Sequence, residues 1–171
     1  MTTLTGWDAD EAVGELYGAH YRSLVRLSVL LVRDVGTAEE VVQDAFVAMH
    51  GRWGRLRDPD KALAYLRQAV VNRSRSVLRH RGVVERHEAR ATVAGAVPTA
   101  EESVLHHERR ARVLDALRGL PTRQREVLAL RYYLDLSEAD IAATLGISRG
   151  AVKSHASRGA AALRSLLEEP S

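Results

Sequence analysis

The sequence predicts an all-α protein made of two small helical domains joined by a flexible linker. Ala, Leu, Val, Arg and Glu dominate its 171 residues and only 5% are aromatic, a composition that favours helix over sheet. Apolar residues recur at three- and four-residue steps over most of the chain, which is the period of a helix with one buried face. Turn and capping residues separate these stretches, and a segment without clear periodicity divides the chain near its middle.

The first domain is expected over residues 8–82 and begins with a long helix from Asp10 to Arg33. A turn at residues 34–36 follows. Thr37 is then predicted to be the N-cap of a second helix, with Glu40 three residues later completing a capping box. An apolar stripe marks the buried side of this second helix: Val41, Val42, Ala45, Phe46 and Met49.

A basic loop over residues 51–59 leads into a third helix from Asp60 to Arg81. We expect Trp53 in the loop to pack in the core, because large aromatic side chains are mostly buried. Leu63, Leu66 and Val70 indicate the inner side of the third helix. Its opposite side is polar and basic and carries Tyr65, Gln68, Asn72, Arg75, Ser76 and Arg79.

Residues 83–100 are interpreted as the linker, because Gly, Pro, Thr and small alanines interrupt the helical period there. The second domain is expected over residues 101–168. Its first helix spans Ser103 to Arg118, and Thr122 is predicted to cap a helix that ends near Leu134. The side chains expected to face inward from the first of these helices are Val104, Leu105, Val113, Leu114 and Leu117.

Residues 137–164 carry the most specific pattern, that of a helix-turn-helix. Ser137 is predicted to cap a short helix, Gly146 to end it in the left-handed region, and Ser148 to cap the next helix. Ala142 is small enough for close contact between the two helices. Ile147 and Val152 would hold the second helix at its angle.

The outward face of that second helix is small and cationic: Arg149, Gly150, Lys153, Ser154, Ser157 and Arg158. Small residues let a helix enter the major groove, and the cations can donate to phosphates or guanine. The alternative is a plain helical hairpin with a solvated charged face. Gly159 lies in mid-helix, where it marks either close packing or a bend.

Other features exclude several function classes. The chain has no cysteine, which excludes disulfides and Cys-ligated zinc, and no apolar run is long enough to span a bilayer. Its seven histidines form no recognised ligand spacing, and no phosphate loop or nucleophile motif occurs, so we expect no catalytic residue, metal or cofactor. All but two of the 25 basic residues are arginine, which suits phosphate binding but also follows from a GC-rich genome.

The C-terminal half resembles region 4 of the extracytoplasmic-function (ECF) RNA polymerase sigma factors of the sigma-70 superfamily. The similar stretches are Leu120-Pro121, Arg125 to Leu128, Arg131 to Tyr133, Ile141-Ala142, Leu145 to Ser148 and Gly150 to Ser154. The N-terminal half resembles region 2, through residues 38–46 and 64–79. The pattern is most similar to actinobacterial, sigma-E-like members. Tyr65 replaces a usual Trp, His155 and Ala156 replace Arg and Leu, and Gly159 replaces Ala.

This resemblance implies a promoter-recognition factor that binds core polymerase in the cytoplasm without entering a membrane. Region 2 would contact the −10 element through Tyr65, Gln68, Asn72, Arg73, Arg75 and Arg79. Region 4 would contact the −35 element through Arg149, Gly150, Lys153, Ser154, Ser157 and Arg158. Glu39, Glu40, Gln43 and Asp44 would meet the β′ clamp coiled coil. For the first two carboxylates, a stabilising position at a helix N-terminus is the alternative.

The family resemblance also implies contacts with the β flap of polymerase and with an anti-sigma factor. A helix-turn-helix regulator that is not a polymerase subunit is the alternative function. It would account for the C-terminal half but leave the basic side of the helix at residues 60–81 without a role.

Overall fold

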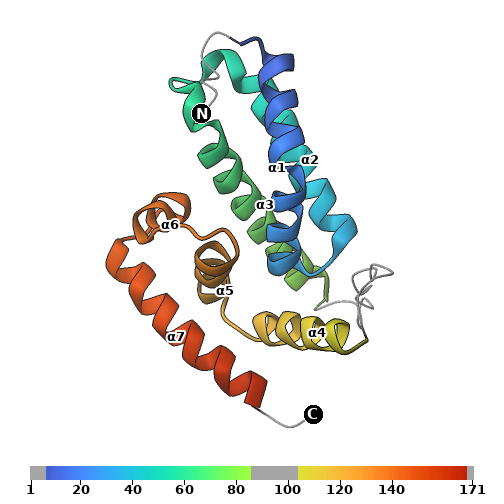
Figure 1. The fold of residues 1–171 in the computed structure, drawn as a ribbon, viewed down its shortest axis with the longest axis vertical. Helices are drawn as coiled ribbons and strands as arrows, with labels where there is room; N and C mark the ends of the chain where they lie inside the picture. The colour runs from blue at the N-terminus through green and yellow to red at the C-terminus, as the bar shows by residue number, and fades with distance from the viewer. Residues whose placement is uncertain (1–6, 86–103, 169–171) are drawn as a thin grey trace.

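The computed structural model describes residues 7–85 and 104–168, and within these ranges every regular element is helical (Figure 1). The all-α prediction is therefore confirmed. Most of the predicted linker, from residue 86 onward, lies outside the described residues.

The N-terminal half is a bundle of three long helices: α1 (Ala9–Val32), α2 (Val35–Arg52) and α3 (Ala62–Glu85). Two short 3-10 turns, η1 (Trp53–Arg55) and η2 (Pro59–Lys61), join α2 to α3. Each helix buries its apolar stripe against the other two, as the helical period predicts. Leu24, Leu27, Val42, Met49, Leu66 and Val70 are almost fully buried at the centre. Trp53 is also buried, as expected, and its indole Nε1 donates to the Trp7 carbonyl at 3.1 Å.

The predicted capping box at the start of α2 is wrong. The helix begins at Val35, and the N-cap is Asp34 without a side-chain bond to a helical N–H. Thr37 lies inside the first turn, where its hydroxyl donates to the Asp34 carboxylate. Arg81 donates to both side chains and to the Val32 carbonyl, so an arginine from α3 stabilises the corner between α1 and α2. Arg81 and Thr37 are 44 positions apart in the sequence, so no local pattern could predict this contact.

The C-terminal half contains α4 (Val104–Arg118), α5 (Thr122–Leu128), a π-turn over Ala129–Tyr133, α6 (Glu138–Leu145) and α7 (Arg149–Glu168). The capping role predicted for Thr122 is wrong, because this residue is already in the helix and Pro121 precedes it as N-cap.

Three side chains of α4 expected in the core are exposed: Val104 by 74%, Leu105 by 55% and Val113 by 39%. Only one side of the end of this helix packs on the body, through Ala116 and Leu117. The helical pattern was read correctly, but within the described residues too few elements pack on α4 to cover its apolar side.

Gly159 marks close packing rather than a bend, because α7 runs unbroken through it. A Cβ at this position would lie 3.2 Å from Gln124 Cβ and from Leu128 Cδ1. The glycine therefore lets α7 approach α5 at backbone distance.

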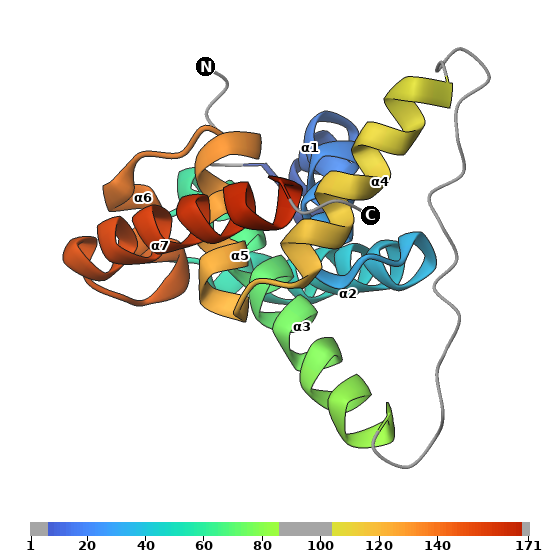
Figure 2. The ribbon, with the colours of Figure 1, turned by 90° about the horizontal axis from the view of Figure 1, so that it is seen from below.

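The two halves share one hydrophobic cluster, which runs from α1 and α3 into α5, α6 and α7. Figures 1 and 2 show α5 and α6 beside the three-helix bundle, with α7 on the outer side. Val127, Leu130 and Ile141 are fully buried within it. The sequence predicted two domains on a tether, and this packing between them carried no sequence signal because each half already has its own amphipathic pattern.

Candidate nucleic-acid interface

The helix-turn-helix forms as the sequence predicts. The Ser137 hydroxyl accepts from the Asp140 N–H at 3.1 Å and caps α6. Gly146 ends α6 with φ of +68°, a left-handed conformation that glycine adopts without a steric penalty. Ser148 accepts from the Ala151 N–H at 3.0 Å and caps α7. The Gly146 N–H also donates to the Ala142 carbonyl, so the two ends of the turn, at Gly146 and Ser148, are both held by hydrogen bonds.

The outward face of α7 is open to solvent, on the outer edge of the molecule (Figure 1). Of its six predicted residues, only Ser154 is half-buried, and the exposed ones are Arg149, Gly150, Lys153, Ser157 and Arg158. Glu138 partly offsets their charge, because its carboxylate lies 3.8 Å from Lys153 Nζ and 3.9 Å from an Arg131 nitrogen. The structure therefore brings all six predicted residues onto one accessible helix.

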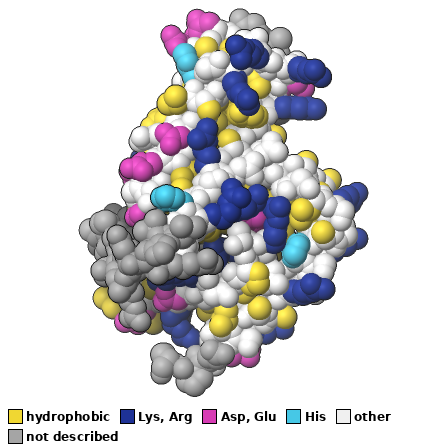
Figure 3. Space-filling model, turned by 180° about the vertical axis from the view of Figure 1, so that it is seen from behind, with side chains coloured by type: hydrophobic (Ala, Val, Ile, Leu, Met, Phe, Trp, Pro, Cys, Tyr) yellow, Lys and Arg dark blue, Asp and Glu magenta, His cyan; other side chains and the backbone are white. Residues whose placement is uncertain are grey.

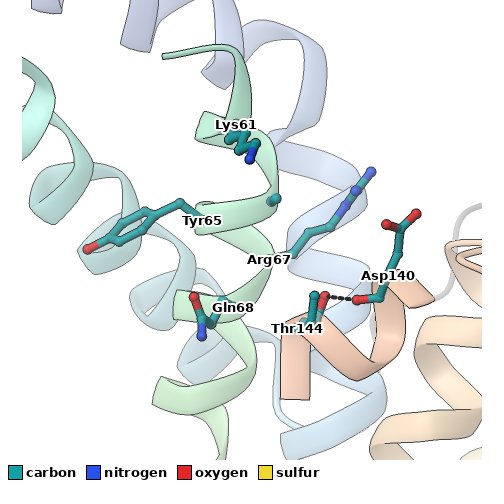
Figure 4. Close-up of a pocket in the computed structure, with 8 residues that line it drawn as sticks. Lys61, Tyr65, Arg67, Gln68, Asp140 and Thr144 are labelled. Atoms are coloured by element: carbon teal, nitrogen blue, oxygen red, sulfur yellow. Dashed lines mark hydrogen bonds between the residues drawn. The ribbon is translucent and has the colours of Figure 1, made fainter. Parts of the chain in front are cut away.

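The polar side of α3 carries the second set of predicted residues, of which Figure 4 labels Tyr65 and Gln68. In this view Tyr65 points away from α6. Its hydroxyl accepts from Arg52 at 2.8 Å, and the Arg52 guanidinium carbon lies 6.0 Å from the ring centroid. Arg52 therefore orients Tyr65 by a hydrogen bond and by charge. Arg52 was not among the predicted site residues, although a basic loop next to an aromatic-bearing helix was an available signal.

Gln68, Asn72, Arg73 and Arg79 are exposed along α3, as a nucleic-acid contact requires. Arg79 donates to the Ser76 hydroxyl at 3.1 Å, which leaves most of its donors to solvent. Arg75 is placed differently from the others. It is half-buried and donates from Nε and Nη2 to the two carboxylate oxygens of Glu126, at 2.9 and 3.0 Å.

Arg67 is a second residue that the sequence argument missed. It points from α3 toward Asp140 of α6, across a cavity of about 340 Å³ that Tyr65 and Gln68 also line (Figure 4). Burial lowers the pKa of the Arg67 guanidinium and the Asp140 carboxylate opposes that shift. The ordinary pKa of an arginine side chain is so high that Arg67 stays charged despite this lowering.

The predicted polymerase-binding residues form one exposed strip on α2: Glu39, Glu40, Gln43 and Asp44. Figure 3 shows Lys and Arg gathered at the end of the bundle where α2 meets α3 and across the middle of the molecule, with acidic side chains mostly along the opposite edge. On this face the acidic and basic side chains lie mostly apart, which suits two different partners.

Among the described residues, no group of three or more His, Asp or Glu side chains could hold a metal ion. Over the same ranges, no helix has the length and apolar character needed to cross a membrane.

Two family models match the chain. The model of sigma-70 region 2 matches residues 16–83, which is most of the three-helix bundle. The model of sigma-70 region 4 matches residues 110–163, from α4 into α7. The two matches occur in the order that the resemblance implied.

Curated relatives extend this similarity over most of the chain. The RNA polymerase sigma-E factor of Streptomyces avermitilis is 35% identical over 153 residues, covering 85% of this chain and 79% of the relative. The ECF RNA polymerase sigma factor SigL of Mycobacterium tuberculosis is 31% identical and covers 99% of this chain and 97% of the relative.

Two solved structures share the fold. The sigma factor RpoE of Bartonella quintana, determined with the anti-sigma factor NepR, superimposes with a TM-score of 0.76 at 24% identity over 95% of this chain and 99% of that one. CnrH, determined with the cytosolic domain of CnrY, has a TM-score of 0.72 at 27% identity over 95% of this chain and 96% of that one.

Proposed function

The chain belongs to the ECF sigma factors of the sigma-70 family, which direct RNA polymerase to promoters, and from this premise we propose which of its surfaces carries each contact. Residues 8–82 are assigned to region 2, residues 83–100 to the linker and residues 101–168 to region 4. Helix α3 reaches Glu85, three residues past the proposed end of region 2.

Region 4 would read the −35 element by inserting α7 into the major groove. Arg149, Lys153 and Arg158 are exposed cations, and the intervening small residues allow the helix to approach the bases. The capped N-terminus of α7 adds backbone N–H donors for a phosphate. The single observation that carries this assignment is the exposure of the predicted face on a helix that begins directly after a turn held by the left-handed Gly146 and the Ser148 cap.

Region 2 would read the −10 element along α3. Asn72 offers both a donor and an acceptor to the edge of an unpaired base, and Tyr65, oriented by Arg52, offers a ring for stacking. Gln68 lies on the same side. Arg73 and Arg79 would bind backbone phosphates, as would Arg75 once it is free of Glu126.

The acidic strip on α2 would dock on the β′ clamp coiled coil of core polymerase, where complementary charge orients the encounter. The β flap is the expected partner of region 4. Because RpoE was determined with the anti-sigma factor NepR, a protein of this kind is the expected inhibitor of this chain. The site of action would be the cytoplasm, where polymerase and chromosome meet.

The test is transcription in vitro with bacterial core polymerase and this chain alone. Sequencing the transcripts maps the promoters, and we expect a shared pair of upstream elements among them. A helix-turn-helix regulator that is not a polymerase subunit would instead bind DNA without core and fail to start transcripts with it. Failure to join core polymerase would contradict the assignment.

A further inference from the structure

The strongest unexplained feature is the ion pair that joins the two halves. Arg75 lies among the residues proposed for the −10 element, yet both of its bonds to Glu126 are made across the boundary between α3 and α5. The Glu126 side chain is only 2% exposed, whereas that of Arg75 is 25% exposed. The carboxylate is therefore enclosed by the protein, and the guanidinium reaches in from the surface of α3.

Further contacts hold α5 in this position. Arg123 donates to the same carboxylate at 3.2 Å, so Glu126 accepts from both halves of the chain. The buried Arg125 donates to the carbonyls of Leu117 and Leu120 and, at 3.3 Å, to that of Leu31 in α1. Polar bonds thus run from α5 to both α1 and α3.

The chemistry of this pair is that of a DNA contact. A guanidinium binds a carboxylate and a phosphate with the same two-pronged geometry. Glu126 takes the Nε and Nη2 donors of Arg75, and Nη1 donates to Asn72 Oδ1 at 3.4 Å, so the side-on fork of this guanidinium is closed to a phosphate while the pair is formed. Access to the polar side of α3 is also limited farther along the helix. There Asp140 of α6 faces Arg67 across the cavity that Tyr65 and Gln68 line.

We propose that region 4 masks part of the −10 surface of region 2 in cis, with the Glu126 carboxylate in the place of a DNA phosphate on Arg75. The free chain is then held closed, and α3 binds promoter DNA fully only after the halves separate. The masking of a DNA contact rests on the proposed role of α3. The closed state of the free chain does not depend on that role.

An ion pair suits such a contact because it can be exchanged. Burying two charges costs much of what their attraction returns, so a buried pair adds little net stability compared with apolar packing. When the halves separate, water solvates Glu126 and a phosphate replaces it on Arg75. Contacts with core polymerase would supply the free energy that exposes the shared apolar residues.

Glu126→Gln in the full-length chain tests the proposal, because the amide keeps the shape but loses the charge. Glu15→Gln is the matched control, since it makes the same charge change at an exposed position of α1. The chain has no cysteine, so Ala19→Cys in α1 and Ser165→Cys in α7, both exposed, give two defined sites for spin labels. Pulsed electron paramagnetic resonance then measures the distance between the halves.

We expect Glu126→Gln to lengthen and broaden the distance distribution, while Glu15→Gln matches the parent. We also expect Glu126→Gln to bind a fluorescent 12-nucleotide single strand of mixed sequence about tenfold more tightly, as the loss of one charge-assisted contact implies. Adding Arg75→Gln to Glu126→Gln should reduce the salt slope of that binding by about 0.7, the value for one phosphate contact on a single strand.

An unchanged distance distribution in Glu126→Gln overturns the proposal, and so does separation of the halves without a gain in single-strand affinity. Should Glu126→Gln lose its helical circular dichroism, Arg75→Gln alone decides by the distance, because its side chain lies at the edge of the contact. Failure of the proposed function would appear elsewhere, as a wild-type chain that starts no transcript with core polymerase.

Discussion

Three arginines show that the role of a charged residue follows from its partners rather than from its type. Arg158 is exposed on α7, Arg125 is buried on backbone carbonyls, and Arg75 is held by a carboxylate. In the sequence all three are simply arginine, with nothing that distinguishes one from another. Only the first is free in this structure to bind DNA, so substitutions at the three positions have different expected effects.

Arg158→Ala should weaken binding of the holoenzyme to the upstream half of a mapped promoter by about 1–3 kcal/mol, or roughly 5- to 150-fold, as expected for a base or phosphate contact. Gel-shift titration on DNA with the intact and the altered −35 element measures this loss. Arg26→Ala is the control, because Arg26 is exposed on α1, away from the proposed face. Equal losses from the two substitutions would count against the assignment.

Asn72→Ala should impair promoter opening by roughly 10-fold while leaving the closed complex nearly intact, because a base edge becomes readable only after the strands separate. Permanganate reactivity of unpaired thymines measures opening, and a gel shift in the cold measures the closed complex. Loss of both steps to the same extent would contradict a base-reading role.

The free energy of unfolding should depend on pH through the Asp34 carboxyl. The hydrogen bond from the Thr37 hydroxyl, with help from Arg81, lowers the pKa of this carboxyl. Since the folded-state pKa is lowered, the contribution is complete above the ordinary aspartate range, near about pH 4, and is lost as the pH falls toward the folded value. Urea unfolding from pH 7 down to pH 3 should show Asp34→Asn less stable than wild type at neutral pH, with the gap closing in acid. A constant gap would refute this linkage.

At the scale of the elements, the contact between α5 and α7 depends on the missing side chain of Gly159. Gly159→Leu should destabilise the protein by about 1–3 kcal/mol through overpacking against Gln124 and Leu128. Urea denaturation measures the change. Gly14→Leu is the matched control, because a Cβ there meets nothing within 4 Å, and it should be neutral or stabilising. A stable Gly159→Leu would show that α7 can move away from α5 at little cost.

The π-turn over Ala129–Tyr133 is an element that the helical period did not predict. The Leu134 N–H donates to the Ala129 carbonyl at 3.3 Å, and Asp135 then takes a positive φ of 54°. This widened turn and the left-handed residue after it end the helix and direct the chain into α6. The sequence placed the end of the helix near Leu134 correctly. Side chains alone, however, do not show whether a backbone N–H donates to the carbonyl five residues earlier or to the one four residues earlier.

At the scale of the whole molecule, promoter binding should depend steeply on salt, because the proposed contacts are largely cations on phosphates. For the holoenzyme, Lys153→Gln should reduce the slope of log affinity against log salt by about 0.9, the value for one contact on duplex DNA. Arg26→Gln, with the same charge change at an exposed position of α1, should leave the slope unchanged. Equal slopes for all three proteins would indicate that Lys153 does not touch a phosphate.

The sequence alone determined the helical class, the helix-turn-helix with its caps, and the exposed faces of α3 and α7. These features depend on local spacing: the helical period, a serine before a helix, and a glycine where the backbone turns left-handed. The predicted start of α2 was wrong, because Thr37 lies inside the first turn, where its hydroxyl donates to Asp34 and accepts from Arg81 of α3.

Tertiary structure alone decided that the two halves meet, that Arg75 is held by Glu126, and that Val104 and Leu105 stay exposed. A periodic pattern states which side of a helix is apolar but not which element covers it. Likewise, composition gives the number of charges but not the partner of each. Contacts between distant segments depend on how the helices are assembled, so the state of the surface proposed for the −10 element could be read only from the folded chain.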